Sequence, residues 1–160
     1  VSLLFFLYFF CFLCALLSFQ VDLSMRGLSH NDAELISKVI RGNVHLQQLK
    51  LGYNDFGDDG VRVIASACIQ NGVHHQSLSL LDLGFNNFGD EGCTALACHA
   101  IAGNQALRSL YLSGNHLRKK GAMAIAGALL HGCGLSAIHI SANPIGPIGM
   151  KVLAGAVAQC

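Results

Sequence analysis

One eleven-residue pattern constrains this chain more than any other feature of its sequence. The pattern is L-x-x-L-x-L-x-x-N-x-Φ, where Φ is apolar, and it occurs in residues 46–56, 78–88, 107–117 and 135–145. A weaker copy at residues 18–28 has Arg26 in place of the asparagine. The anchor positions 26, 54, 86, 115 and 143 lie 28, 32, 29 and 28 residues apart. A fixed period of about 20 to 50 residues is typical of a solenoid built from stacked repeats.

Each copy predicts a short strand followed by a turn. The Leu-x-Leu part places its leucines on one face of a strand, because side chains alternate along a strand. Stacked copies form a parallel sheet, with strands predicted near residues 21–24, 49–52, 81–84, 110–113 and 138–141. A buried asparagine can bond the backbone groups that the turn leaves without sheet partners. The sequence therefore predicts four structural anchors, Asn54, Asn86, Asn115 and Asn143.

A helix is predicted after each turn. The residues nine, ten and thirteen positions after each anchor form one helical stripe, which is apolar except at His99. Asp58 and Asp90 lie at the predicted helix starts, where negative charge and side-chain caps are favoured. The predicted fold is an α/β solenoid, a right-handed horseshoe arc of five repeats with the parallel sheet on its concave face. The glycines predicted to open the helices are Gly60, Gly92, Gly121 and Gly149.

Two stretches resemble the ribonuclease-inhibitor type of leucine-rich repeat. Residues 54–60 read NDFGDDG and residues 86–92 read NNFGDEG, close to the N-x-Φ-G-D-x-G part of that family's repeat. The resemblance covers residues 18–160, and asparagine at the anchors, without alternating cysteine, looks closer to the repeats of nucleotide-binding immune receptors. It implies a domain that binds a protein partner. Ran GTPase-activating protein has similar repeats, so the resemblance also implies GTPase activation as an alternative function.

Residues 1–19 differ from the rest of the chain, because they carry no charge and include six of the nine phenylalanines. As a helix, this segment would span roughly 28 Å, close to a bilayer's hydrocarbon thickness of about 30 Å. We therefore expect an apolar helix at residues 1–19 and a leucine-rich repeat domain at residues 20–160. The segment is interpreted as a signal or membrane anchor, with a buried terminal helix and a non-native leader as alternatives.

Two features conflict over the compartment. The chain has no N-x-[ST] glycosylation acceptor, and its seven cysteines show no regular framework, so free thiols and the repeat type favour the cytoplasm. A genuine anchor at residues 1–19 would instead associate the chain with a membrane. The five cysteines within the repeats are expected to be small buried residues.

Composition and motifs argue against several functions. Lys and Arg number 10 against 9 Asp and Glu, which excludes a strongly basic nucleic-acid binder. The sequence has no nucleophile elbow, phosphate-binding loop, dinucleotide fingerprint or zinc-binding cysteine pair. Cys98 and His99 adjoin on a predicted helix, about 100° apart around its axis, so they cannot easily hold one metal. No enzymatic activity, cofactor or metal is predicted.

Candidate binding residues lie between the leucines, on the predicted concave face. Residues at the same position in successive repeats form a column across the sheet. The column four positions before the anchors begins with Asp22 and Lys50, and the column one position before the anchors contains the aromatic residues Tyr53 and Phe85. Aromatic residues beside charges are typical of interaction hot spots. Lys50 between Asp22 and Asp82 also fits a charge ladder that only stabilises the sheet. The predicted partner-binding residues are Lys50, Tyr53, Asp82, Phe85, Tyr111 and His139.

A second charged surface is predicted in the fourth repeat. Arg118, Lys119 and Lys120 place three positive charges at a helix start, where the helix dipole disfavours them. This secondary patch is either a solvated loop or a contact for an acidic partner or anionic lipid headgroups. His74 and His75 lie in the extra residues of the second repeat, interpreted as a loop insertion or a pH-sensitive contact.

The sequence favours an interaction module that binds an unidentified protein through its concave face. A GTPase-activating module of the Ran type would need a catalytic arginine, and the spacing singles out none of Arg62, Arg108 and Arg118. A third expectation is a non-functional fragment of a larger receptor, because the chain ends shortly before a further strand is due. Nucleic acid is not expected as a partner, and membrane contact depends on residues 1–19.

Overall fold

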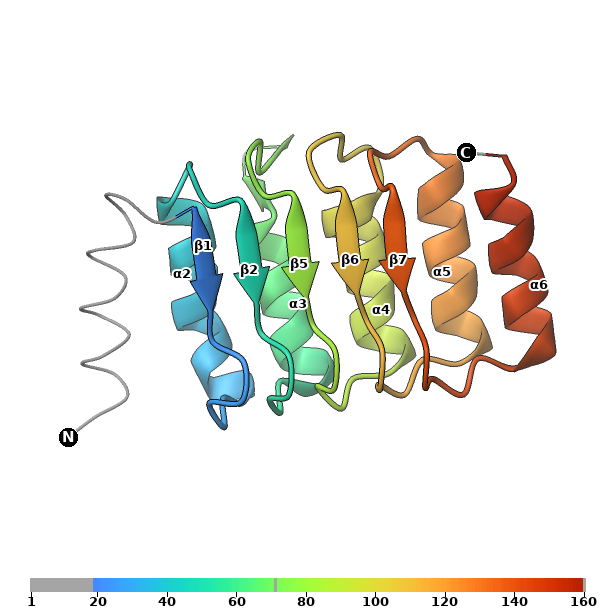
Figure 1. Ribbon diagram of the computed structural model, residues 1–160, viewed down its shortest axis with the longest axis horizontal. Coiled ribbons are helices and arrows are strands. Elements are labelled where there is room, and N and C mark those ends of the chain that lie inside the picture. Colours follow the sequence, from blue (N-terminus) through green and yellow to red (C-terminus); the bar gives the residue numbers. More distant parts are fainter. Residues whose placement is uncertain (1–18, 71, 160) are drawn as a thin grey trace.

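The sheet and helices of this chain alternate as the repeat predicts. The structure is a computed structural model that describes residues 19–70 and 72–159. One parallel sheet has the strand order β1-β2-β5-β6-β7, which follows the sequence (Figure 1). This arrangement confirms the predicted α/β solenoid. The strands are β1 (Gln20–Asp22), β2 (Gln48–Lys50), β5 (Leu80–Asp82), β6 (Ser109–Tyr111) and β7 (Ala137–His139).

A helix follows each strand and leads to the next one. The helix after β1 begins with a short 3-10 turn, η1 (His30–Asp32), whose capping box is formed by Ser29 and Asp32. The helix after β5 continues without a break as a π-helix, η2 (Ala97–Ile101). The α-helices are α2 (Ala33–Gly42), α3 (Gly57–Ala67), α4 (Asp90–Leu96), α5 (Lys119–Leu130) and α6 (Gly146–Val157).

The strands pair in register through their central residue. Val21 pairs with Leu49, Leu49 with Leu81, Leu81 with Leu110 and Leu110 with Ile138. Each strand is three residues long and begins one residue earlier than predicted. The central side chains of β1, β2, β5 and β6 are buried, because that face of the sheet packs against the helices.

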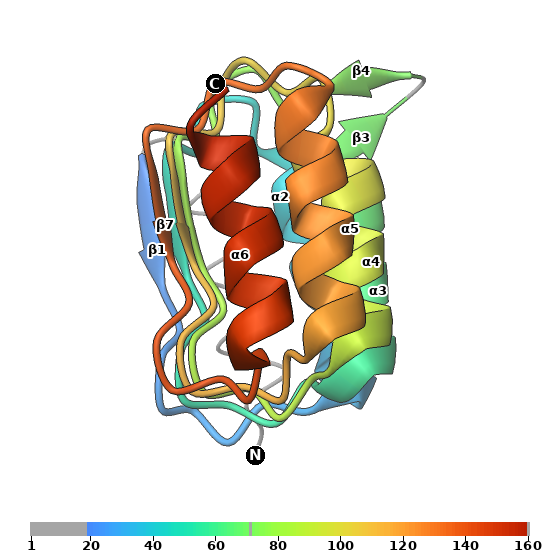
Figure 2. The same ribbon diagram turned by 90° about the vertical axis from the view of Figure 1, so that its right-hand side faces the viewer.

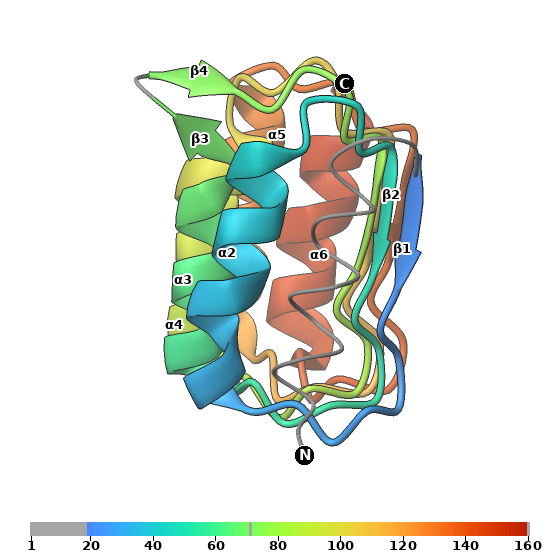
Figure 3. The same cartoon turned by 90° about the vertical axis from the view of Figure 1, so that its left-hand side faces the viewer.

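All five α-helices cover one face of the sheet. In the two end views the sheet stands on one side and the helices on the other (Figures 2 and 3). We call the uncovered side the open face; it corresponds to the concave face of the sequence prediction. Residues that alternate with the buried leucines therefore point away from the helices.

The hydrophobic core lies between the sheet and the helices. Its largest fully buried side chains are Phe56 and Phe88, which follow the anchors of two successive repeats. In the last repeat, Ile138 and Ile140 are only partly buried, although the matching leucines Leu110 and Leu112 are fully buried. Each repeat of a solenoid is covered by its neighbours, so the last described repeat shields its own core less completely.

The anchor asparagines link each turn to the preceding repeat. Asn54 Oδ1 accepts hydrogen bonds from the N–H groups of Arg26 (3.1 Å) and Leu28 (3.0 Å). Its Nδ2 donates to Leu23 O at 3.0 Å and to Leu51 O at 2.8 Å. Every bond satisfies a backbone group that lies outside the strand ladders. Asn54 therefore ties two repeats together where their strands end.

Asn86 is less completely bonded than the other anchors. Its Nδ2 donates to Leu51 O and Gly84 O, both at 3.0 Å. Its Oδ1 is buried and has no hydrogen-bond partner among the described residues. By contrast, Asn115 Oδ1 accepts from Asn86 N at 2.8 Å, and Asn143 Oδ1 accepts from Leu117 N at 3.1 Å. The anchors are therefore unequal in what they stabilise.

The regular spacing of the four glycines has a different cause from the one predicted. Helices α3 to α6 begin two or three residues before Gly60, Gly92, Gly121 and Gly149, so these glycines do not open the helices. They lie buried in the first turn, against the preceding repeat. A Cβ on Gly92 would lie 2.9 Å from Asp58 Oδ1. Close packing between neighbouring repeats, rather than helix initiation, requires glycine here.

Asp58 and Asp90 cap the helix of the following repeat, not their own. Asp58 Oδ1 accepts from Gly89 N at 2.9 Å and from Gly92 N at 2.6 Å, at the start of α4. Asp90 Oδ1 accepts from the N–H groups of Arg118 (2.8 Å) and Gly121 (2.7 Å), at the start of α5. Both carboxylates satisfy helix N–H groups that lack intrahelical partners. The capping contacts therefore hold successive repeats together.

The extra residues of the second repeat form a small hairpin. Strands β3 (Ile69–Gln70) and β4 (Val73–His74) pair antiparallel and project beyond the helices (Figures 2 and 3). The His75 ring secures the return to the sheet. Its Nδ1 accepts from Leu78 N at 3.1 Å, and its Nε2 lies 3.0 Å from Asn43 O. His75 is thus bonded to the backbone of the repeat that precedes its own and to the first residue of the repeat that follows.

The cysteines of the repeats are not uniformly buried. Cys68 and Cys93 are buried, Cys133 is half-buried and Cys98 is exposed, which corrects the expectation that all would be core residues. The difference arises because Cys98 lies on the outer side of the π-helix. Burial raises the pKa of the Cys68 and Cys93 thiols to about 12, with Asp90 and Asp58 adding to the effect at Cys93.

We expect Cys98 to react with iodoacetamide in the native chain at pH 8, while Cys68 and Cys93 remain unlabelled. The reactive species is the thiolate, and burial keeps both core thiols protonated far above this pH. Peptide mass spectrometry before and after addition of urea gives the test. Native labelling of Cys68 or Cys93 at the rate of Cys98 would contradict their buried positions.

Residues 1–18, which hold nearly all of the predicted apolar helix, lie outside the described residues. The proposed anchor at residues 1–19 therefore stays a prediction. Within residues 19–70 and 72–159, no helix has the length and apolar character needed to span a membrane.

Candidate functional site

The candidate site lies on the open face, where the strands end. The position before each anchor has a left-handed backbone in all five repeats, with φ between 54° and 70°. Glycine adopts this conformation readily, whereas other residues pay about 1 to 2 kcal/mol. Only the fourth repeat has glycine there. The five residues in this row are Met25, Tyr53, Phe85, Gly114 and Ala142.

Large apolar side chains occupy the first three positions of this row and are exposed. Met25 is 71% exposed, Tyr53 53% and Phe85 42%. The Tyr53 and Phe85 rings stack with their centroids 4.3 Å apart and an interplanar angle of 8°. A Cβ on Gly114 would collide with the Phe85 ring, so glycine leaves the space that this ring occupies. The first three repeats therefore carry an exposed apolar row with a fixed ring geometry.

Three charged residues lie beside this row, on neighbouring strands. Asp22 pairs in register with Lys50, and Lys50 with Asp82. Asp22 Oδ1 accepts from Ser24 N at 3.0 Å, and this bond holds the pKa of Asp22 below its usual value despite partial burial, with Lys50 contributing. Asp82 Oδ1 accepts from Gly84 N at 2.9 Å. Both carboxylates are thus held in place by the backbone of their own repeat.

A second pair of stacked rings continues the same column. Tyr111 and His139 lie with ring centroids 4.2 Å apart and an interplanar angle of 2°. Tyr111 also pairs in register with Asp82, so the column runs from Asp22 to His139 across the sheet. The structure therefore places all six predicted binding residues on the open face, as two ring pairs and a charged stretch.

Met25 belongs to the same row, although sequence reasoning did not select it. The first repeat has Arg26 at its anchor, and its Met25 is neither aromatic nor charged. Its position before the anchor was the available signal. Met25 extends the apolar row by one repeat towards β1.

The basic trio lies away from the open face. Arg118, Lys119 and Lys120 are all exposed at the start of α5. The Asp90 carboxylate bonds the Arg118 and Gly121 N–H groups of the same helix start, which offsets the unfavourable dipole interaction of the three cations. The trio and the open face are therefore separate candidate surfaces.

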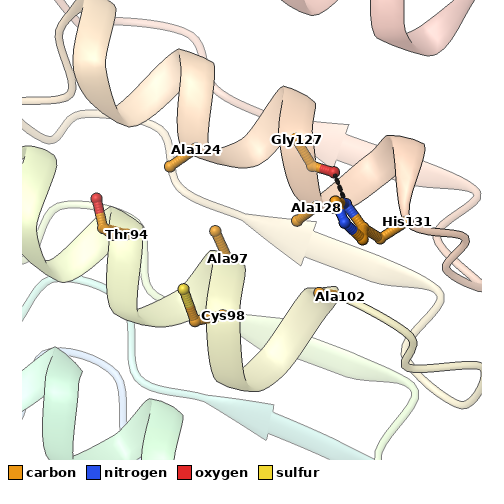
Figure 4. A pocket seen from close by; sticks show the side chains of 8 residues that line it. All are labelled: Thr94, Ala97, Cys98, Ala102, Ala124, Gly127, Ala128 and His131. Carbon is orange, nitrogen blue, oxygen red and sulfur yellow. Dashed lines mark hydrogen bonds between the residues drawn. The ribbon is translucent and has the colours of Figure 1, made fainter.

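A groove of about 510 Å³ lies on the helix side, between α4 with its π-helical continuation and α5 (Figure 4). Cys98 and His131 come from opposite sides of it, and His131 is turned towards its own helix. Its Nδ1–H donates to Gly127 O at 2.7 Å. The other lining residues are small or uncharged, namely Thr94, Ala97, Ala102, Ala124, Gly127 and Ala128. This arrangement provides no base positioned to activate the Cys98 thiol.

Metal chemistry has no support in the described part of the chain. Among residues 19–70 and 72–159, no group of three or more His, Cys, Asp and Glu side chains could hold an ion. Cys98 is exposed, while His99 is half-buried on the same helix.

Three segments of the chain match a leucine-rich repeat family. Residues 42–65, 74–97 and 103–126 match the family described as Leucine Rich repeat. A solved structure of "Leiomodin-1 Actin-Binding Site 2 (ABS2)" resembles this chain with a TM-score of 0.71 and 15% identity, covering 99% of this chain and 92% of that one. No curated protein matches the sequence. The structural likeness shows the fold, the family match shows leucine-rich repeats in three segments, and the ribonuclease-inhibitor subtype stays a prediction.

Proposed function

We propose that this chain is a protein-protein interaction module that binds its partner through the open face. One observation carries the proposal: bulky side chains are exposed at backbone positions that favour glycine. Met25, Tyr53 and Phe85 each have φ between 55° and 57° and are 42% exposed or more. Their left-handed backbone lowers folding stability, and their exposed apolar side chains contribute no burial energy in return. Contact with a partner explains why the chain holds them there.

The composition of the face supports protein recognition. Aromatic residues dominate binding hot spots, because they bury much area while fixing few torsions. Here two stacked pairs, Tyr53 with Phe85 and Tyr111 with His139, are already ordered without a partner. Binding such a surface costs little side-chain entropy. The face can therefore act as a preformed docking platform.

The GTPase-activating alternative receives less support from the arginines. Arg62 pairs with Asp59 at 3.0 Å, and Arg108 NH1 donates to Gly134 O at 2.8 Å. Both side chains are engaged within the chain, although a catalytic arginine must be able to reach a nucleotide on another protein. Arg118 is exposed and belongs to the basic trio. We therefore favour the binding module.

Actin is the first partner to test, because the similar leiomodin-1 structure is that of an actin-binding site. Monomeric actin and actin filaments can be titrated with the full chain, and chemical crosslinking of cell extract followed by mass spectrometry supplies other candidates. Each candidate is then purified and its Kd for the chain is measured. An actin result alone does not decide the face, which requires variants.

Changing Tyr53 or Phe85 to alanine is expected to weaken binding of the purified partner by roughly tenfold or more each, because each removes a central apolar contact. Met123→Ala and Leu130→Ala remove exposed apolar residues of α5 and serve as matched controls, expected to change Kd by less than about twofold. Titration calorimetry gives the Kd, and scanning calorimetry shows whether each variant is still folded. A partner that tolerates the open-face variants but is lost with Arg118→Glu or Lys119→Glu would refute the proposal.

A further inference from the structure

We propose that the open face recognises a basic side chain of its partner, an arginine, that pairs with Asp82 and lies against the neighbouring rings. This inference rests on the proposed function and specifies the chemistry of its partner. Asp82 lies on the central strand, where the charged stretch ends and the register neighbour on the next strand is Tyr111. In the described part of the chain its Oδ2 has no hydrogen bond, and no ion pair joins it to Lys50.

Asp82 is half-buried, and two neighbouring glycines leave the room that its carboxylate occupies. A Cβ on Gly52 would lie 3.3 Å from Asp82 Oδ2, and one on Gly84 would lie 3.3 Å from Oδ1. Both positions are glycine, so no side chain of the adjacent column covers the carboxylate. At the same time the Gly84 N–H bond to Oδ1, at 2.9 Å, fixes its orientation. An approaching donor therefore finds one oriented carboxylate with Oδ2 available.

Aromatic residues neighbour Asp82 on the open face. Tyr111 is the register neighbour of Asp82 on β6, and Phe85 follows Asp82 by three residues, just after the end of β5. Phe85 in turn stacks on Tyr53. A guanidinium group can form hydrogen bonds to a carboxylate and stack on aromatic faces at once, whereas an ammonium group does this less well. Arginine therefore fits the combination of groups better than lysine.

Charge also favours a cation at this position. Residues 22–91 carry nine acidic and five basic side chains, so the first three repeats have a net charge of −4. Within the charged stretch itself, Lys50 offsets only one of Asp22 and Asp82. Complementary charge speeds encounter and suppresses partners of the same sign. An acidic segment would be repelled here and would meet the basic trio at α5 instead.

The test uses a display library of random linear peptides selected against the immobilised full chain. We expect arginine to be enriched at one position beside apolar residues. A selected peptide is then synthesised with arginine or with citrulline, which has nearly the same shape but no charge. Citrulline should weaken binding to the wild-type chain about tenfold or more. For the Asp82→Asn variant, replacing arginine by citrulline in the peptide should weaken binding by less than about threefold. The amide oxygen of this variant can still accept the Gly84 N–H, so the variant keeps the local backbone contact.

Glu91→Gln is the matched control, because Glu91 is an exposed acid on α4 rather than on the open face. It should keep the full arginine effect. Equal citrulline effects in wild type and Asp82→Asn, enrichment without basic residues, or failure to enrich any peptide would each overturn this inference. Selected peptides that lack arginine but still lose affinity with Tyr53→Ala leave the proposed function standing. Peptides that ignore Asp82→Asn, Tyr53→Ala and Phe85→Ala together contradict the proposed function as well.

Discussion

Asn115→Ala is expected to lower the free energy of unfolding by about 3 to 5 kcal/mol. Asn115 Oδ1 accepts from Asn86 N at 2.8 Å, and its Nδ2 donates to Leu83 O at 3.0 Å. Among the described residues, neither backbone group has another hydrogen-bond partner. Each buried group left unsatisfied costs about 1 to 3 kcal/mol, and the lost side-chain volume adds to this. Urea denaturation followed by circular dichroism measures the loss.

Asn86→Ala is the matched control and should cost only about 1 kcal/mol. The carbonyl groups that Asn86 bonds keep other partners, since Leu51 O also accepts from Asn54 Nδ2 and Gly84 O accepts from Tyr53 N. Asn86 Oδ1 is itself buried without a partner among the described residues, so its removal relieves a penalty. Equal losses for the two variants would contradict the proposed inequality between the anchors.

Gly121→Ala is expected to destabilise the chain by about 2 to 4 kcal/mol. The added Cβ would lie 2.7 Å from Asp90 Oδ1 and 3.2 Å from Cys93 Cβ. Asp90 must then move and release the Gly121 and Arg118 N–H groups that it caps. Without this cap, Lys119 and Lys120 meet an uncompensated helix dipole. Packing and electrostatics therefore both oppose the change.

Gly127→Ala in the same helix provides the control. No heavy atom lies within 4 Å of a Cβ at Gly127, apart from the local helix itself. Alanine is the better helix former, so this variant should gain about 0.5 to 1 kcal/mol. Thermal unfolding of the two variants is the test. A loss of stability in Gly127→Ala similar to that in Gly121→Ala would contradict the role assigned to the contact with Asp90.

The repeat made the sheet predictable from sequence, because the leucine spacing and the asparagine anchors are local patterns. The central strand residues Leu49, Leu81 and Leu110 align in register as the pattern requires. The helix starts were harder to predict from the sequence. Gly92 is glycine because it packs against Asp58 of the preceding repeat. Within a single repeat, the same glycine looks like the first residue of a helix. Contacts between repeats depend on stacking geometry, which spacing alone does not give.

The candidate site was predictable in its residues but not in its geometry. Alternation along the strands places Lys50 and Asp82 on the open face without any structural information. The left-handed backbone at Tyr53 and Phe85 has no sequence signal, because aromatic residues disfavour it. Met25 was missed because it is neither aromatic nor charged, although its position before the anchor was visible in the sequence. The exposure of Cys98 follows helical periodicity, because the buried side chains of this segment fall at Cys93, Leu96, Ala97, Ala100 and Ile101.

The central claim is that the open face, rather than the helix side, contacts the partner. Photocrosslinking tests it most directly, with p-benzoylphenylalanine placed at Tyr53 or Tyr111 on the open face and at Met123 or Leu130 on α5. The purified partner is irradiated with each variant, and crosslinked peptides are sequenced by mass spectrometry. Crosslinks from positions 53 and 111, and none from 123 and 130, are the predicted result. Crosslinks confined to positions 123 and 130 would contradict the account.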